Sequence, residues 1–352
     1  MKRSYLILVL FSLVITSITS NSYAIVMDDL YVIELQATDQ TTTERQDLFL
    51  KAFKQVLFKL TGDDKIFAAM QAKLIKDQID KYISSFSYVD NAAGTLQLKV
   101  IFNESMINTW LKDSNIAYLS KNRPIALTWL LVDKNSEFSL IGEDDQELKI
   151  NKLEQMAADQ AIPLVLPLLD LDERTKVQVN DILNGSPTIL HAAATTYNAD
   201  IILVGKIKHV AEEWQAKWNI LGTPAVAWDT KGRTIDDLYI QLMSSLREHL
   251  INGYTPANQP DNTAIDVVKV RIDGVDSIER YAKILEYLRG LAAVKLVKVV
   301  DVANNNATFE LNVNGGEEVV KRAINLDKFL EKALTMDENV ATANELHYKV
   351  RL

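Results

Sequence analysis

The stretch Ile125–Val132 reads IALTWLLV, and the stretch Asp200–Ile207 reads DIILVGKI. Each is a short apolar run with the length of one strand rather than of a typical helix. Runs of this kind are typical of strands that are buried on both faces of a sheet. The sequence therefore predicts two buried strands here, as in an α/β fold.

The segments around these strands alternate between helical and extended patterns across residues 121–255. The predicted strands are Glu137–Ile141, Pro163–Leu169, Val210–Leu221 and Ala225–Asp229, and the predicted helices are Asn151–Gln160, Thr188–Tyr197 and Ile235–Leu250. In the last helix, leucines recur at every fourth residue and form an apolar face. We interpret residues 121–255 as an α/β module.

Residues 25–120 predict a smaller module with the element order βααββα. Its first helix is predicted from capping-box spacing at Thr43 and Gln46 and ends at Gly62. The other predicted elements are a strand at Tyr31–Leu35, a helix at Ala68–Ile79, a hairpin of Tyr82–Val89 and Thr95–Phe102, and a helix at Glu104–Asp113.

Residues 256–352 follow a stretch rich in Gly, Pro and Asn at Gly253–Thr263, which predicts a linker. The predicted elements are strand Ile265–Ile272, a helix from Asp276 to Arg289, a hairpin of Val294–Val302 and Thr308–Val313, helix Glu317–Leu334 and strand Leu346–Leu352. The order βαββαβ is that of a ferredoxin-like module. The fold class is thus α/β and α+β, in three small modules.

The first 24 residues have the three parts of a secretory signal peptide. Met1–Arg3 is basic, Tyr5–Ile15 is almost entirely apolar, and Ser22–Ala24 offers small residues at a cleavage site. An uncleaved membrane anchor is the alternative. After Ala24 no apolar stretch reaches 18 residues, so we expect no membrane span after cleavage and a location in the periplasm.

The composition argues against several classes of function. The chain has 352 residues, with 38 Lys and Arg against 47 Asp and Glu, and its net charge of -9 disfavours a nucleic-acid partner. It contains no Cys, and its four His residues form no metal-binding motif. No glycine-rich phosphate loop is present, so no cofactor is predicted.

Two groups of residues are candidates for contact with a ligand or partner. Asp170, Asp172 and Glu173 follow the end of an apolar strand, where sites in α/β folds often lie. Trp214 and Trp218 share one face of a predicted strand, where they could stack against sugar rings or a peptide. The alternative for the tryptophans is burial under the helix Ile235–Leu250, because that helix needs an apolar surface to pack on.

Several short motifs carry a resemblance to a known family. They extend over most of the mature chain and are the strand and helix of Tyr31–Leu60, Asn122–Arg123–Pro124 before Leu127–Thr128–Trp129–Leu130, Ile162–Pro163–Leu164 with Leu166–Pro167–Leu168–Leu169–Asp170–Leu171, and Tyr197–Asn198–Ala199–Asp200 before Ile202–Leu203–Val204–Gly205. Together they resemble an exported proteobacterial family known as domain of unknown function 2066, which implies no catalytic residues.

A similarity at the level of fold concerns two further regions. The strand that ends at Gly205–Lys206 is similar to those of TolB amino-terminal and CsgG-like domains, and the first module resembles the amino-terminal region of flagellar assembly protein T. These resemblances imply adaptors and assembly factors of the cell envelope.

We therefore expect a non-enzymatic adaptor or assembly factor of the periplasm that acts through an envelope protein partner. Two alternatives stay open. One is a periplasmic binding module for a small molecule or a cell-wall fragment. The other is an enzyme whose catalytic residues are dispersed along the chain, because such sites are defined by geometry rather than by spacing.

Overall fold

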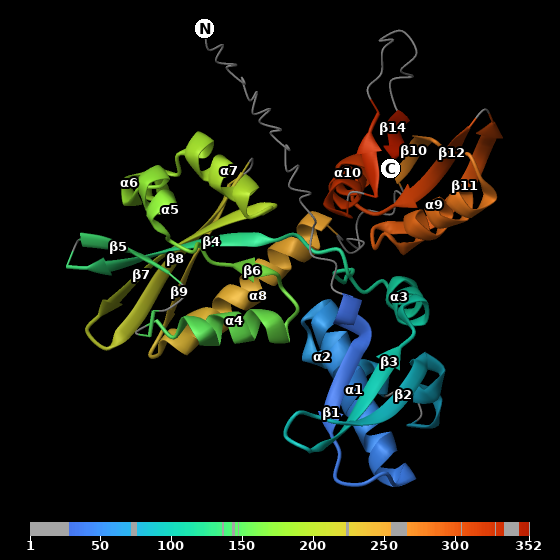
Figure 1. Cartoon of the computed structure of the whole chain (residues 1–352), viewed down its shortest axis with the longest axis horizontal. Helices are drawn as coiled ribbons and strands as arrows, with labels where there is room; N and C mark the ends of the chain where they lie inside the picture. Colours follow the sequence, from blue (N-terminus) through green and yellow to red (C-terminus); the bar gives the residue numbers. More distant parts are fainter. Residues whose placement is uncertain are drawn as a thin grey trace, which may run out of the picture.

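A computed structural model describes most of the chain in ten ranges. These are residues 28–71, 76–135, 137–142, 145–146, 148–222, 225–254, 266–303, 305–327, 329–333 and 345–351. The predicted signal peptide and most of the predicted linker lie outside them. The described strands form three separate sheets, of three, six and five strands, which confirms a mixed α/β chain of three modules (Figure 1).

The first module is an antiparallel sheet in the order β1-β3-β2, covered by a long helix. Its elements are η1 (Asp28–Tyr31), β1 (Val32–Gln36), α1 (Thr42–Thr61), α2 (Asp64–Gln71), η2 (Lys76–Tyr82), β2 (Ile83–Asp90), β3 (Leu96–Phe102) and α3 (Glu104–Asp113). The predicted order βααββα is confirmed, except that the second helix lies earlier than predicted and is followed by a 3-10 helix. The apolar side of α1 packs on the sheet through Phe49, Phe53, Val56, Leu57 and Leu60.

The cap of helix α1 lies two residues before the predicted capping residue Thr43. The cap is Thr41, whose hydroxyl accepts from the Glu44 backbone N–H. The Glu44 carboxylate in turn accepts from the backbone N–H groups of Thr38 and Asp39. The cap therefore uses Thr41 and Glu44 rather than Thr43 and Gln46, and it is not a complete capping box, because the Thr41 N–H donates to the Asp39 carboxylate instead of to Glu44. Gly62 ends the helix in the left-handed conformation, as predicted.

The middle module is a mixed sheet in the order β5-β4-β7-β8-β9, with the short β6 beside β4. Its strands are β4 (Ala126–Lys134), β5 (Glu137–Ile141), β6 (Leu164–Val165), β7 (Ile201–Val210), β8 (Glu213–Leu221) and β9 (Val226–Gly232), and its helices are α4 (Ile150–Asp159), α5 (Leu171–Lys176), α6 (Val179–Asn184), α7 (Pro187–Thr196) and α8 (Ile235–Tyr254). The two strands predicted from their apolar runs, β4 and β7, are parallel neighbours near the centre of the sheet.

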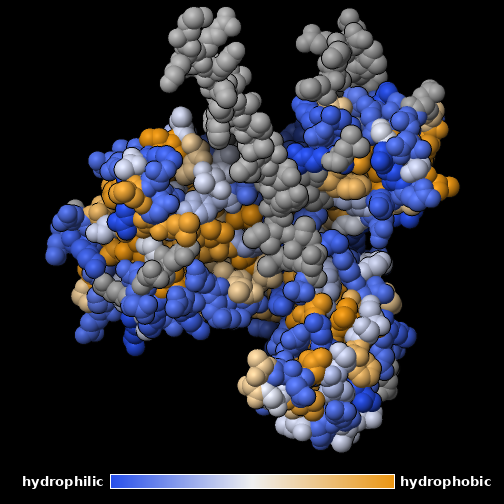
Figure 2. Space-filling model, viewed as in Figure 1, coloured by the Kyte–Doolittle hydropathy of each residue, from blue (hydrophilic) through white to orange (hydrophobic). Residues whose placement is uncertain are grey.

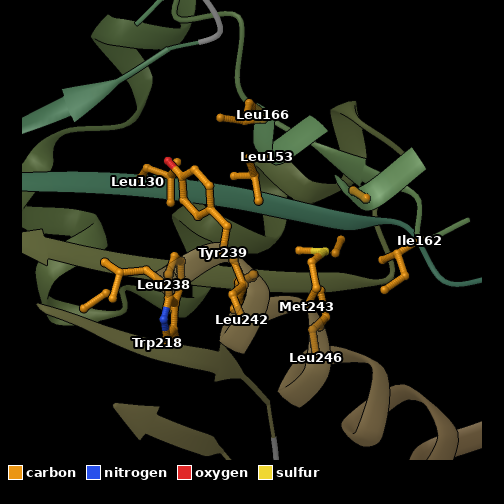
Figure 3. Packing of buried hydrophobic residues seen from close by; sticks show 14 of the residues in the cluster. Leu130, Leu153, Ile162, Leu166, Trp218, Leu238, Tyr239, Leu242, Met243 and Leu246 are labelled. Carbon is orange, nitrogen blue, oxygen red and sulfur yellow. The ribbon is translucent and has the colours of Figure 1, made fainter. Parts of the chain in front are cut away.

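Both faces of this sheet carry helices, but not to the same extent. Helices α4 and α8 cover one face along its length, where Leu238, Leu242 and Leu246 of α8 pack into the larger core (Figure 3). Helices α5, α6 and α7 cover the other face over β4, β5 and the first half of β7, with Leu221 at the end of β8 packed at their margin. The rest of that second face, on β8, β9 and the end of β7, is left open by these helices.

The third module is a sheet in the order β11-β12-β10-β14-β13 with two helices on one face. Its elements are β10 (Asp266–Asp273), α9 (Ile278–Gly290), β11 (Val294–Ala303), β12 (Asn306–Val313), α10 (Gly316–Asp327), β13 (Leu330–Lys332) and β14 (Glu345–Val350). The βαββαβ order holds apart from β13, which lies within the predicted last helix. Because β13 reverses the chain, β14 runs parallel to β10.

Two buried arginines join the first module to the middle one. Arg123 is 0% exposed, and its guanidinium donates to the carbonyls of Lys59, Leu119, Ser120, Gln160 and Ala161. Arg247 on α8 donates to the carbonyls of Phe58, Lys59 and Gln160. The carbonyls of Phe58, Lys59, Gln160 and Ala161 lie at the carboxyl ends of α1 and α4, where helix dipoles favour a positive charge, whereas those of Leu119 and Ser120 lie between α3 and β4.

No carboxylate of the described residues accepts a hydrogen bond from either arginine. Burial, together with the neighbouring charge of Arg247, lowers the pKa of Arg123 to about 9, so it is still charged at neutral pH. The bonds to the two helix ends therefore stabilise the buried charges in place of ion pairs, and they hold two modules together.

The third module contacts both of the others through similar bonds. The Lys112 amine at the end of α3 donates to the carbonyls of Arg289 and Leu291, and burial lowers its pKa to about 8. Arg322 on α10 donates to the Gly253 carbonyl on α8. Within the ranges that the structure describes, no helix combines the length and hydropathy needed to cross a membrane.

Candidate functional site

The predicted acidic residues Asp170, Asp172 and Glu173 lie at the start of α5. The Asp170 carboxylate accepts from the Glu173 backbone N–H at 2.8 Å and caps the helix. The Glu173 carboxylate accepts from the Leu169 N–H at 2.7 Å and from the Tyr197 hydroxyl at 3.0 Å. Asp172 pairs with Lys176 one turn later. The structure thus gives each of the three carboxylates a local partner.

We expect Asp170→Ala to lower the free energy of unfolding by about 1 kcal/mol, the usual cost of losing a helix cap. Urea unfolding followed by circular dichroism measures this. Asp172→Ala is the matched control, because its ion pair with Lys176 is exposed to solvent and such pairs contribute little to stability. Equal stability of the two variants would contradict a capping role for Asp170.

The predicted tryptophans lie on the face of β8 that α8 covers. Trp218 is 1% exposed, and its indole N–H donates to the Thr230 hydroxyl at 2.8 Å (Figure 3). Trp214, nearer the end of the strand, is half-buried against the same core and contacts His209 in a tilted arrangement with the ring centroids 4.6 Å apart. Trp218 therefore contributes to packing under α8, and it presents no ring face to solvent.

The opposite face of the same strands holds a cluster of lysines that the sequence analysis did not single out. The register places Leu131, Lys206, Lys217 and Asp229 side by side across β4, β7, β8 and β9. The next row, two residues along, is Asp133, Lys208, Gln215 and Lys231. Side chains that are directly opposite each other in such rows lie on the same face of the sheet. We call Lys206, Lys208, Lys217 and Lys231 the lysine cluster.

A cavity of about 630 Å³ lies over the lysine cluster. Its walls include all four lysines, with Phe138 of β5 on one side and Gln241 of α8 on another. Ligand cavities typically have volumes of about 300–1,000 Å³, so this space suits a small molecule. The cavity exists because α5, α6 and α7 cover only the other half of this face.

The charges in this cavity are poorly matched for stability. Lys206 donates to the Leu183 carbonyl at 3.2 Å, at the end of α6, whereas Lys208, Lys217 and Lys231 form no ion pair within the part of the chain that the structure describes. The acidic residues Asp133, Glu213 and Asp229 also line the cavity, so four positive side chains face three negative ones. Asp229 lies opposite Lys217 in the register but forms no ion pair with it.

The lysines on the other two sheets are arranged differently. Lys99 lies opposite Glu34 with their charged atoms 3.0 Å apart, and Lys349 lies opposite Glu331 at 2.8 Å. Lys298 lies opposite Glu310 at 3.2 Å. Like charges directly across a strand pair are destabilising, whereas opposite charges are favourable. The direct Lys206–Lys217 neighbours therefore depart from the pattern that this protein uses elsewhere.

A second exposed feature is β11, the edge strand of the third sheet. It is ten residues long, against a usual length of about five or six. Its exposed apolar residues include Leu296 (57% exposed) and Val300 (47% exposed), with Val299 and Val302 beside them. Figure 2 shows hydrophobic residues at the outer rim of this module, where β11 lies in Figure 1. An edge strand leaves half of its backbone N–H and C=O groups unpaired by the sheet, so it can bind another strand.

Neither the lysine cluster nor the β11 edge was predicted as a site. The alternation of Glu213, Gln215, Lys217 and Asn219 marked a polar face of one strand. The lysines of β7 and β9 join that face only through the register, which a single sequence does not reveal. Among the described residues, no group of three or more His, Cys, Asp and Glu lies close enough to hold a metal ion.

The fold and these surfaces describe a three-module α/β protein with an open sheet face and a free sheet edge. Residues 24–120, which contain the first sheet and its helices, match the family described as Domain of unknown function (DUF8605). The motifs, which include Tyr31–Leu60 inside this range, suggested a different family, so what is shown is a domain of unknown function over residues 24–120 and not the family that the motifs suggested. No curated protein and no solved structure matches the chain.

Proposed function

We propose that this chain is a non-enzymatic adaptor or assembly factor of the cell envelope that works in the periplasm and binds another envelope protein through β11. The observation that carries the proposal is the long, exposed and apolar edge of the third sheet. Strand addition to such an edge is a common mode of recognition, in which backbone hydrogen bonds supply affinity and side chains supply specificity.

The charge pattern of β11 restricts which partner can pair with it. Lys295 and Lys298 lie among the exposed valines and Leu296, and the register with β12 shifts at two points along the strand. Lysines and bulges of this kind hinder unspecific edge-to-edge pairing. The strand therefore favours an extended partner segment in which acidic residues alternate with apolar ones.

Two further observations support this function. The buried bonds of Arg123, Arg247 and Lys112 join the three modules, so a partner held by β11 has a defined position relative to the other two. The signal-peptide pattern of residues 1–24 supports a location in the periplasm. The fold-level resemblance to TolB amino-terminal and CsgG-like domains and to flagellar assembly protein T points the same way, as an analogy.

The test is a double substitution on the edge, Leu296→Lys with Val300→Lys, in the full chain with a carboxyl-terminal tag. We expect an envelope protein to co-purify with the wild type and its recovery to fall about tenfold in the variant, because interface cores exclude unpaired charge. Ile278→Lys is the matched control, since Ile278 is 79% exposed on α9 of the same module. Equal recovery of the partner with the wild type, the double variant and Ile278→Lys would contradict the proposal. A hydrolytic activity of the purified protein that a single substitution abolishes would also contradict it.

A further inference from the structure

We propose that the cavity over the lysine cluster of the middle module binds a small molecule that carries a phosphate monoester. This site is separate from β11, and it gives the chain a second binding function. The inference rests on three features: the volume of the cavity, the juxtaposition of Lys206 and Lys217, and the absence of ion pairs at Lys208, Lys217 and Lys231 among the described residues.

The lysine cluster places like charges close together, which is electrostatically unfavourable in the free protein. Lys206 and Lys217 are direct cross-strand neighbours, and Lys208 and Lys231 lie in the next row on the same face. If this sheet had only a structural role, a glutamate in place of one of these lysines would make the cross-strand pair more favourable. The Lys99–Glu34 pair of the first module is such a pair. Departures from such local rules are typical of functional sites.

The amines of the four lysines are placed so that they can surround one anion in the cavity. The stem of Lys206 is half-buried and its amine is held at the Leu183 carbonyl, so this lysine is positioned before any ligand binds. The side chains of Lys208, Lys217 and Lys231 are exposed at the cavity walls and can turn toward a common anion. An anion among them would neutralise the mutual repulsion that the free protein retains.

The residue types in the cavity wall indicate the chemistry of the ligand. The cavity walls contain lysines but no arginine. A lysine amine is a compact charge with three rotatable donors, which suits a phosphate dianion, whereas a planar carboxylate is better matched by the fork of an arginine. Asp133, Glu213 and Asp229 at the margins can accept hydrogen bonds from hydroxyl groups, and Phe138 offers a ring for apolar contact. A phosphorylated sugar, free or as the headgroup of a lipid, has this combination of groups.

The experiment is isothermal titration calorimetry of the full chain in two arms. One arm uses glucose 1-phosphate in solution, and the other uses phosphatidylcholine vesicles with and without a phosphorylated glycolipid. The variants are Lys217→Gln and Lys231→Gln, whose side chains make no contact needed for folding. Lys283→Gln on α9 is the matched control, because this lysine is exposed in another module.

We expect binding in at least one arm, and we expect each cavity substitution to weaken it about tenfold, which corresponds to about 1.4 kcal/mol. Lys283→Gln should bind as the wild type does, and added salt should weaken binding. Binding in the first arm identifies a free sugar phosphate, and binding only in the second identifies a lipid headgroup. Absence of binding in both arms, or equal binding by the wild type and both cavity variants, would overturn the inference.

Discussion

Replacing Arg123 by methionine is expected to lower the free energy of unfolding by about 3–5 kcal/mol. Methionine fills a similar space but donates no hydrogen bond. Five carbonyl oxygens would lose this donor, and those of Leu119 and Ala161 lie in buried bonds, whereas Lys59 and Gln160 would still accept from Arg247. Each unsatisfied buried acceptor costs about 1–3 kcal/mol, although relaxation of the junction recovers part of the sum.

The measurement is urea unfolding of the full chain, followed by fluorescence and by circular dichroism. We expect Arg123→Met to shift the midpoint and to separate the unfolding of the first two modules, because this arginine bonds to both. Arg289→Met is the matched control: its side chain is exposed, so its effect should stay within about 0.5 kcal/mol. The loss of unfolding free energy in Arg123→Lys should lie between those of Arg123→Met and Arg289→Met, since an amine cannot reproduce the fork of the guanidinium. Unfolding of Arg123→Met like that of the wild type would contradict a role for Arg123 in holding the two modules together.

Trp218→Ala is expected to destabilise the middle module by about 3–5 kcal/mol, the usual cost of removing a fully buried aromatic ring. The ring fills the space over Gly205, where an added Cβ would lie 2.3 Å from the Trp218 Cζ3 atom. Tryptophan at 218 and glycine at 205 are therefore matched in size across β7 and β8. The substitution would also leave the Thr230 hydroxyl without its donor.

Trp214 provides the comparison for this second prediction. It lies on the same strand and face but is half-buried, so Trp214→Ala should cost only about 1–2 kcal/mol. Trp218→Phe keeps an aromatic ring at this position, so its destabilisation should lie between those of Trp214→Ala and Trp218→Ala. Chemical unfolding of the three variants measures the order. Similar stabilities of Trp214→Ala and Trp218→Ala would contradict the burial of Trp218 and favour a stacking surface.

Much of the fold follows from local patterns in the sequence. The apolar runs at 125–132 and 200–207 predicted β4 and β7, and the leucines of Ile235–Leu250 predicted α8, because burial in these elements leaves a regular period. Helices α5 and α6 were not predicted, since Asp172–Lys176 is mostly charged and shows no apolar face. The signal for α5 was the cap at Asp170, a residue predicted as a ligand-contact candidate instead, and the signal for α6 was the pair Gln178 and Asp181 at its start.

The features that matter most for function depend on long-range placement. Nothing near Arg123 or Arg247 in the sequence indicates that each is buried, because their partners are backbone carbonyls as far away as Lys59. The lysine cluster forms from three strands that the register brings together. The strand β11 was predicted, but its position at an edge is a property of the whole sheet.

The most direct test of the proposed function asks what touches β11 in living cells. A photo-crosslinking amino acid would replace Leu296 or Val300 in the full chain, with Ile278 on α9 as the control position. We predict that both β11 positions crosslink to the same envelope protein after irradiation, and that position 278 does not. No crosslinked product from either β11 position, or the same products from all three positions, would contradict the proposal that the chain acts by offering this strand to a partner.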